Sequence, residues 1–129
     1  MNIPNDAPAI VISLTSSTPE AIWHQVLLGI EEEGIPWQWQ QDDDADAVQR
    51  AWQAATRSPL LVGLACSADE IIVHFRNLPP ASPLFRQAWG QDKDQLRQLG
   101  NNAARLVKGL PFKLSPKSHS HNPIKDREI

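Results

Sequence analysis

Three consecutive glutamates are the most chemically suggestive residues of this chain. Glu31, Glu32 and Glu33 lie at the end of a predicted helix, just before Gly34. The helix dipole disfavours negative charge at this end, and a cation or a basic partner would offset the resulting repulsion. A solvated, charged turn explains the same run without any ligand. The run is therefore a candidate binding site, with a plain surface turn as the alternative.

The same helix predicts one buried and one exposed face. Its apolar stripe consists of Ile22, Trp23, Val26, Leu27 and Ile30. Leu28 and Glu32 lie one turn apart on the opposite side, so we expect both to be exposed. An exposed leucine beside an exposed carboxylate is typical of a surface that contacts a partner. A lone carboxylate completes a Mg²⁺ shell only with ligands from elsewhere, so spacing alone does not make Glu32 a metal ligand.

Motifs for catalysis and for phosphate binding are missing from the sequence. Neither the P-loop pattern nor the dinucleotide-binding glycine pattern occurs, so we do not expect ATPase activity from this chain alone. Cys66 and His74 flank a predicted hairpin, but a cysteine that ends an apolar strand is more often a buried small hydrophobe. His119 and His121 are too few for a specific metal site. We therefore expect no catalytic residue and no cofactor-binding residue.

Composition limits the classes of protein to which the chain can belong. Its 129 residues are 41% hydrophobic and 21% charged, with a formal net charge of -3, as in one ordinary globular domain. The excess of acids disfavours nonspecific binding to nucleic acid. A single cysteine excludes an internal disulfide, and the sequence contains neither a signal peptide nor an apolar run of about 18 residues. We expect a cytoplasmic protein that contacts neither nucleic acid nor membrane.

The pattern of apolar residues, prolines and glycines predicts the elements that position these side chains. Strands are expected at 9–14, 35–40, 60–66, 71–75 and 84–89, and helices at 19–33, 42–57 and 92–109. Thr18 is the expected cap of the first helix, and Asp92 and Gly109 are the expected limits of the last. The order predicts a three-layer α/β sandwich with a mostly parallel sheet. Residues 1–114 would form this domain, and 115–129 a flexible tail.

Several strings of the sequence resemble one protein family. They occur at 7–12, 26–36, 51–55, 58–63, 72–74, 77–79 and 100–109. The second string contains G-I-E-E-E-G-I-P, and the last begins G-N-N-A-A-R. Together they resemble the small subunit of diol dehydratase reactivase, the chaperone-like factor that rescues adenosylcobalamin-dependent diol and glycerol dehydratases. The resemblance spans residues 7–112 and is closer to the diol than to the glycerol branch, while the tail departs from it.

The resemblance implies a fold and a set of partners. The fold is a mixed five-stranded sheet with helices on both faces, akin to the medium subunit of the dehydratase. The large subunit of the factor binds ATP and ADP and joins the small subunit in a two-plus-two complex. The small subunit then leaves, so that the large one docks on the dehydratase and releases damaged cobalamin. The setting is propanediol utilisation in the cytoplasm, free or inside a bacterial microcompartment.

The resemblance also implies a role for the glutamate run. The middle glutamate of the family motif, here Glu32, contributes to a divalent ion such as Mg²⁺ at the interface with the large subunit. We therefore expect Leu28, Glu31 and Glu32 to lie in the partner interface. The cobalamin-binding string D-x-H-x-x-G is absent.

Two other functions remain open at this stage. The chain would instead be a truncated medium-type subunit of a cobalamin-dependent dehydratase if it helped to cover the cofactor. Fold analogy alone also allows an RNA-binding module, against which the acidic composition argues.

Overall fold

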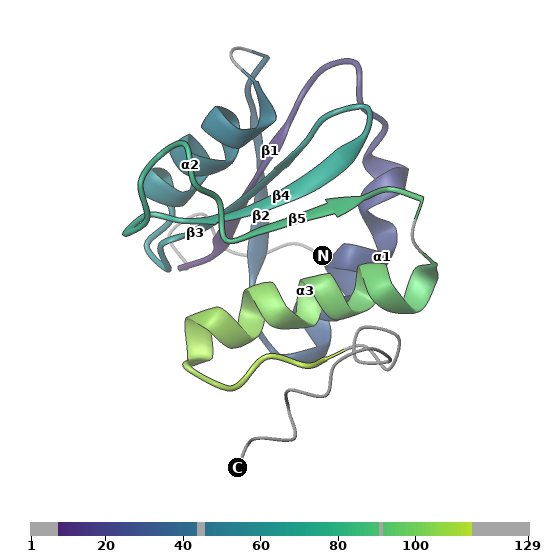
Figure 1. The fold of residues 1–129 in the computed structure, drawn as a ribbon, viewed down its shortest axis with the longest axis vertical. Helices are drawn as coiled ribbons and strands as arrows, with labels where there is room; N and C mark the ends of the chain where they lie inside the picture. The colour runs from purple at the N-terminus through teal and green to yellow at the C-terminus, as the bar shows by residue number, and fades with distance from the viewer. Residues whose placement is uncertain (1–7, 44–45, 91, 115–129) are drawn as a thin grey trace.

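A mixed five-stranded sheet forms the middle layer of the protein (Figure 1). The computed structural model describes residues 8–43, 46–90 and 92–114. The strands are β1 (Ile10–Leu14), β2 (Trp37–Gln41), β3 (Val62–Cys66), β4 (Glu70–Phe75) and β5 (Phe85–Ala88). Their order across the sheet is β2-β1-β3-β4-β5, and β1 pairs in parallel with both β2 and β3. The pairs β3–β4 and β4–β5 are antiparallel.

Helices cover both faces of this sheet, as expected. The helix α2 (Ala47–Arg57) packs on β3, β4 and β1, whereas α1 (His24–Glu32) and α3 (Lys93–Lys108) pack together on the opposite face (Figure 1). A short 3-10 helix, η1 (Glu20–Trp23), precedes α1. The three-layer sandwich and the mixed five-stranded sheet are therefore confirmed. The sheet has two parallel and two antiparallel pairs, so it is less parallel than the sequence pattern indicated.

The burial of the strands follows from their composition. Every residue of β1 and of β3 is buried, because these central strands are apolar on both faces and helices cover each face. The larger core lies under α1 and α3 and includes Trp23, Ile30 and Leu64. The side under α2 is built mainly from alanines, and a Cβ at Gly63 would meet the α2 backbone 2.2 Å away. Small residues thus let α2 approach the sheet closely.

Two predicted helix starts are wrong. Thr18 does not cap the first helix, since its hydroxyl lies 2.7 Å from that of Thr15 and Pro19 holds the cap position. The second helix begins at Ala47, where Asp46 accepts a hydrogen bond from the Gln49 amide at 2.8 Å. Asp42 and Asp43, which were expected in the first turn of this helix, instead lie between β2 and α2, and Asp44 lies outside the described residues.

The other boundaries agree with the local chemistry. Asp92 caps α3, and Gly109 ends it in the left-handed conformation with a φ of 71°. Gly34 likewise adopts a φ of 78° after α1. The expected tail 115–129, with His119 and His121, lies outside the described residues. None of the described helices has the length and apolar character that crossing a membrane requires.

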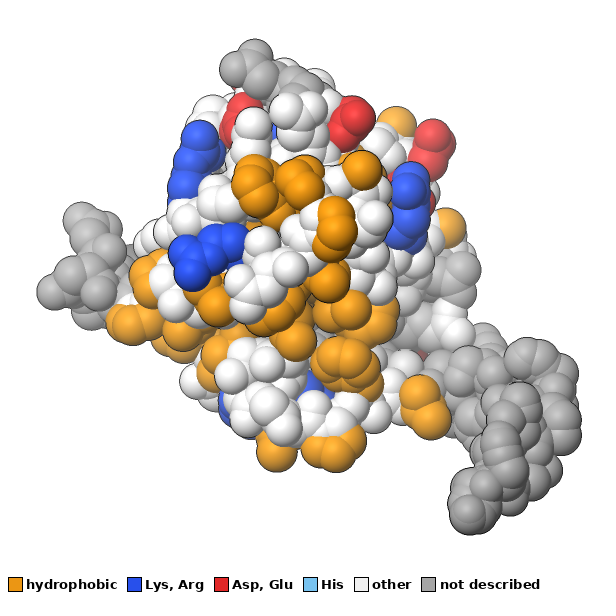
Figure 2. Space-filling view, turned by 60° about the vertical axis from the view of Figure 1, so that its left-hand side comes forward, with side chains coloured by type: hydrophobic (Ala, Val, Ile, Leu, Met, Phe, Trp, Pro, Cys, Tyr) orange, Lys and Arg blue, Asp and Glu red, His pale blue; other side chains and the backbone are white. Residues whose placement is uncertain are grey.

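One face of the molecule presents apolar side chains at its surface. Figure 2 shows apolar side chains gathered over α2 and the β4–β5 connection, with Lys and Arg side chains at the margin. Pro79, Pro80 and Ala81 of this connection are exposed. The Trp52 indole N–H of α2 donates to the Leu78 carbonyl at 3.1 Å and so holds the connection against the helix.

Candidate interaction site at the end of α1

The three glutamates at the end of α1 have three different partners. Glu31 accepts a hydrogen bond from the Trp37 indole N–H at 2.9 Å. Glu32 accepts one from the Asn101 side-chain amide at 3.0 Å. Glu33 pairs with Arg105 and Lys108, each at 3.0 Å. Successive helical residues point about 100° apart, so each carboxylate meets a different part of the protein.

Glu33 is the structural member of the run. Its side chain is only 11% exposed and is enclosed by two cations of α3. The pKa of Glu33 is lowered mainly because Lys108 donates a hydrogen bond to the carboxylate, and Arg105 adds a second one, while burial opposes the shift. The last helix therefore neutralises part of the charge that the sequence pattern left unexplained. Arg105 and Lys108 thus pair with Glu33 in addition to their favourable position at the C-terminal end of α3.

Glu32 is the member of the run that faces a pocket. Its side chain is 45% exposed, and its second carboxylate oxygen lies 3.5 Å from an Arg97 nitrogen. A pocket of about 280 Å³ opens beside it, lined by Glu32, Asp94, Arg97, Gln98, Asn101 and Lys113. An exposed ion pair at this distance contributes little to stability. The carboxylate is thus oriented by a firm amide contact and only loosely paired on its other oxygen.

Asn101 is the residue that positions Glu32. It is buried, and its amide donates to the Gly29 carbonyl at 2.8 Å as well as to Glu32. Its carbonyl accepts from the Lys113 ammonium at 2.9 Å. In the sequence, residues 100–102 lie inside the last predicted helix, as a point where it could restart, and within the family resemblance, with no role predicted for Asn101. A glycine and an asparagine in the interior of a helix are costly for helix propensity, and this was the available signal of a special role.

Two residues of the predicted helix 19–33 differ from the helical-wheel expectation. Leu28 is half-buried rather than exposed, because the wheel considered the sheet alone and α3 also packs against α1. Ile22 was expected in the buried stripe but is 38% exposed. It lies in η1, whose tighter turn of about three residues rotates it off the α-helical stripe.

Close contact between the two helices allows the glutamate site to form. A Cβ at Gly29 would lie 2.0 Å from the Arg97 carbonyl, and one at Gly100 would lie 2.0 Å from the Val26 carbonyl. The helices therefore touch through their backbones at these glycines. This approach brings Asn101 within reach of both Gly29 and Glu32.

The remaining candidate residues do not assemble into a reactive site. Cys66 belongs to the core under α1 and α3, and burial raises the pKa of its thiol. His74 pairs across the hairpin with Gly63, so its side chain lies on the α2 face, opposite to that of Cys66. Its ring is held by the Pro80 carbonyl at 3.0 Å and the Phe75 amide at 3.0 Å. Within 8–43, 46–90 and 92–114, no group of three or more metal-ligating side chains occurs.

Comparison with known proteins gives consistent matches. The dehydratase medium subunit family model matches residues 7–113. The propanediol dehydratase-reactivating factor small subunit of Salmonella typhimurium is 52% identical over 113 residues, which cover 88% of this chain and 97% of that protein. The diol dehydratase-reactivating factor small subunit of Klebsiella michiganensis is 50% identical over 88% of this chain and 90% of its own.

Solved structures agree with these sequence relatives. The structure of a diol dehydratase-reactivating factor complexed with ADP and Mg²⁺ contains a chain that matches with a TM-score of 0.79 and 50% identity. The match covers 84% of this chain and 100% of the other. A glycerol dehydratase reactivase chain matches with a TM-score of 0.77 and 34% identity, over 84% of this chain and 98% of its own.

Proposed function

We propose that this chain works as the non-catalytic small subunit of a diol dehydratase-reactivating factor. The chain belongs to the dehydratase medium-subunit family and, within it, to the small subunits of such factors. It would assemble with a large subunit that binds the nucleotide, in a two-plus-two complex. The single observation that carries the proposal is the match to a chain of a diol dehydratase-reactivating factor. This match covers 100% of that chain at 50% identity.

The proposed action is an exchange of subunits. The small subunit leaves the large subunit. The large subunit then docks on the medium subunit of a diol or glycerol dehydratase, which takes the position that the small subunit held. ATP bound by the large subunit drives the cycle, and damaged cobalamin escapes from the loosened enzyme. The family match supports this action, because a chain built on the medium-subunit domain offers the large subunit a similar surface.

Glu32 is the residue that we propose for the contact with the large subunit. A hard cation such as Mg²⁺ prefers oxygen ligands, and the Glu32 carboxylate is half-exposed, oriented by Asn101 and only loosely paired with Arg97. These features fit one ligand of a shared cation, with the other ligands from the large subunit and water. Mg²⁺, when bound, would supply a positive centre between acidic groups of the two subunits. Leu28 and Glu31 would lie at the same contact.

The test is co-expression with a candidate large subunit, followed by size exclusion with mass detection, with and without Mg²⁺. We expect a two-plus-two complex that Mg²⁺ stabilises. Glu32→Gln keeps an acceptor for Asn101 but removes the charge, and should weaken assembly by about tenfold or more. Glu31→Gln is the matched control, because it keeps an acceptor for Trp37 and should matter less. Equal assembly of both variants and of the unmodified chain would contradict the role of Glu32.

A second candidate function rests on the same family match, which is named for a dehydratase subunit. In this case the chain would be a medium-type subunit of a dehydratase. It would then join dehydratase subunits and retain corrinoid during purification, and would ignore the reactivase large subunit. Absorbance of corrinoid in the purified complex separates the two functions.

A further inference from the structure

A second pocket lies at the carboxyl end of the parallel strands. It is near the N-terminal end of α1, whereas the glutamate site is at the C-terminal end of that helix. It has a volume of about 530 Å³. Ser17 and Thr18 follow β1 and line it on one side, and Ser67 follows β3 and lines it on another. The chain leaves β1 toward β2 and leaves β3 toward β4, in opposite directions across the sheet. β1 and β3 are adjacent parallel strands, and ligands of open α/β sheets bind outside the carboxyl ends of such strands.

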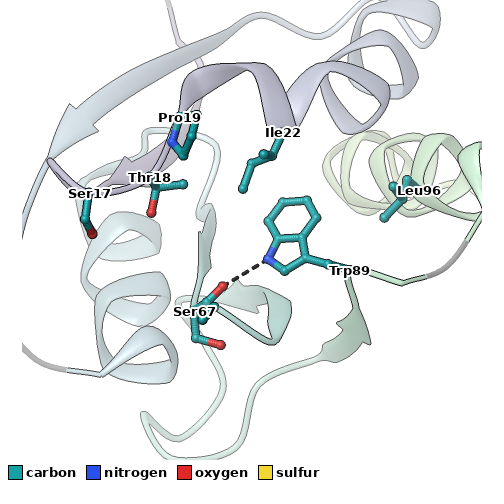
Figure 3. Close-up of a pocket in the computed structure, with 8 residues that line it drawn as sticks. Ser17, Thr18, Pro19, Ile22, Ser67, Trp89 and Leu96 are labelled. Atoms are coloured by element: carbon teal, nitrogen blue, oxygen red, sulfur yellow. Dashed lines mark hydrogen bonds between the residues drawn. The ribbon is translucent and has the colours of Figure 1, made fainter.

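Hydroxyl groups form the polar part of this pocket. Figure 3 shows Ser17 and Thr18 on one wall and Ser67 on the adjacent wall. The Ser67 oxygen accepts hydrogen bonds from the Asp69 and Glu70 amides at 3.1 and 3.2 Å, which leaves its O–H free to donate. The Ser17 and Thr18 hydroxyls lie 3.3 and 2.7 Å from the Thr15 hydroxyl, and each oxygen has a further lone pair, so this wall offers one donor and several acceptors to a neutral hydrogen-bonding group.

Apolar side chains form the rest of the pocket. Ile22, Trp89 and Leu96 come from η1, from the end of β5 and from α3, and Figure 3 shows the indole between the other two. The Trp89 indole N–H donates to the Ser67 carbonyl at 3.0 Å, and its ring also makes an edge contact with Trp23 at 5.6 Å. The ring is therefore fixed and offers the pocket an apolar surface. The exposure of Ile22, unusual for a large apolar residue, is explained by its place in this wall.

We propose that this pocket binds a small uncharged ring compound that carries a hydroxyl or amide group on one side. All of its lining residues are uncharged, so a charged ligand would lose water without gaining an ionic partner. The volume lies within the usual range of about 300–1,000 Å³ for small-molecule sites. The ring would contact Trp89, Ile22 and Leu96, and the polar group would contact the hydroxyl wall.

The proposal is tested with three probes that share one ring and differ in charge. Benzamide is neutral, benzoate is an anion and benzamidine is a cation. The indole N–H signals of the ¹⁵N-labelled full chain are followed by NMR, with Trp89 assigned from Trp89→Phe. We expect a saturable shift of the Trp89 signal with benzamide and about tenfold weaker binding of the two charged probes. Trp52, which contacts Leu78 beside α2, is the internal control and should not shift.

Two matched variants place a charge inside and outside the pocket. Ile22→Glu should abolish benzamide binding, whereas Leu110→Glu should leave it unchanged, since Leu110 is similarly exposed but does not line the pocket. A Trp89 signal that does not saturate, or equal binding of benzoate, would overturn the proposal. Loss of assembly with the large subunit in Ile22→Glu would also overturn it, by assigning the pocket to the protein interface. The Glu32 test of the proposed function is independent of all these outcomes.

Discussion

The run of glutamates shows how position alone separates three identical side chains. Glu31 meets an indole N–H, Glu33 meets two cations, and Glu32 meets an amide and a distant arginine. The first two contacts tie the end of α1 to β2 and to α3. The third orients a carboxylate beside a pocket without neutralising it firmly. At the scale of the residue, this difference singles out Glu32 for an intermolecular role.

Replacing Glu33 tests its structural role. Glu33→Gln should lower the free energy of unfolding at pH 7 by about 1 kcal/mol, because the two cations are partly exposed and glutamine keeps an acceptor for them. The folded protein lowers the pKa of Glu33. At pH values between the folded and the unfolded pKa, the unfolded chain therefore binds more protons than the folded protein. The stabilisation is complete above the ordinary glutamate pKa of about 4.3 and disappears as pH falls through the lower folded value. Urea unfolding between pH 7 and pH 2 measures the gap between the variants.

The control for this prediction is Glu20→Gln, at an exposed position in η1. Its stability should follow that of the unmodified chain within about 0.5 kcal/mol at each pH. A gap between Glu33→Gln and the unmodified chain that stays constant to pH 2 would contradict the ion-pair explanation.

Elements whose limits depend on local chemistry were predictable from the sequence. Buried apolar strands, the Asp92 cap, and the turns at Gly34 and Gly109 all carry their own signals, and the structure agrees with them. The failures have two causes, a distant packing contact in one case and an unexpected local helix geometry in the other. Leu28 is half-buried because α3 lies against α1, and Ile22 is exposed because η1 departs from α-helical geometry.

The candidate site divides in the same way. The helical wheel and the family resemblance both pointed to Glu32. The surrounding residues Arg97, Asn101 and Lys113 were not predicted, because they lie about 65 to 81 positions away along the chain and meet Glu32 only after the helices pack. Hydrophobic periodicity carries information about one helix or strand at a time. This site forms only where the two helices α1 and α3 pack against each other.

Replacing the glycine at the crossing tests this packing. Gly29→Ala would place a methyl group against the Arg97 carbonyl, so we expect a loss of about 1–3 kcal/mol or more despite the better helix propensity of alanine. Gly90→Ala is the matched control, since a Cβ there has nothing within 4 Å and should change stability by about 0.5 kcal/mol or less. Urea titration gives both values. A Gly29→Ala variant as stable as the unmodified chain would show that the helices do not depend on close backbone contact.

At the scale of the whole molecule, the segment after α3 defines where the domain ends. The buried Asn102 side chain accepts from the Lys113 amide at 2.7 Å and donates to its carbonyl at 3.0 Å. Phe112 packs on Phe85 of β5 with a ring separation of 5.1 Å. These contacts attach the segment to the fold, and the family match ends at residue 113. We propose that the folded domain ends at Leu114.

Two truncations test this boundary. A chain that ends at Leu114 should keep the thermal midpoint of the full chain and its assembly with the large subunit. A chain that ends at Gly109 leaves the buried Asn102 amide without its partners, and should lose about 2–4 kcal/mol and several degrees in midpoint. Differential scanning calorimetry compares the three chains. A large loss in the Leu114 chain would place part of the folded unit within 115–129.

The contacts among the tryptophans have an optical consequence. Trp23 lies edge-on to both Trp39 and Trp89, and Trp37 lies edge-on to Trp39, with ring centres 5.0 to 6.4 Å apart. At these separations the transitions of neighbouring indoles couple with one another. The near-ultraviolet dichroism of the chain therefore carries a contribution from these coupled indoles, which extend from the edge strand β2 to the residue after β5, beside the separate contribution of Trp52. A change in the packing of Trp37 or of Trp89, at either end of this row, should therefore alter the dichroism of its neighbours as well as its own.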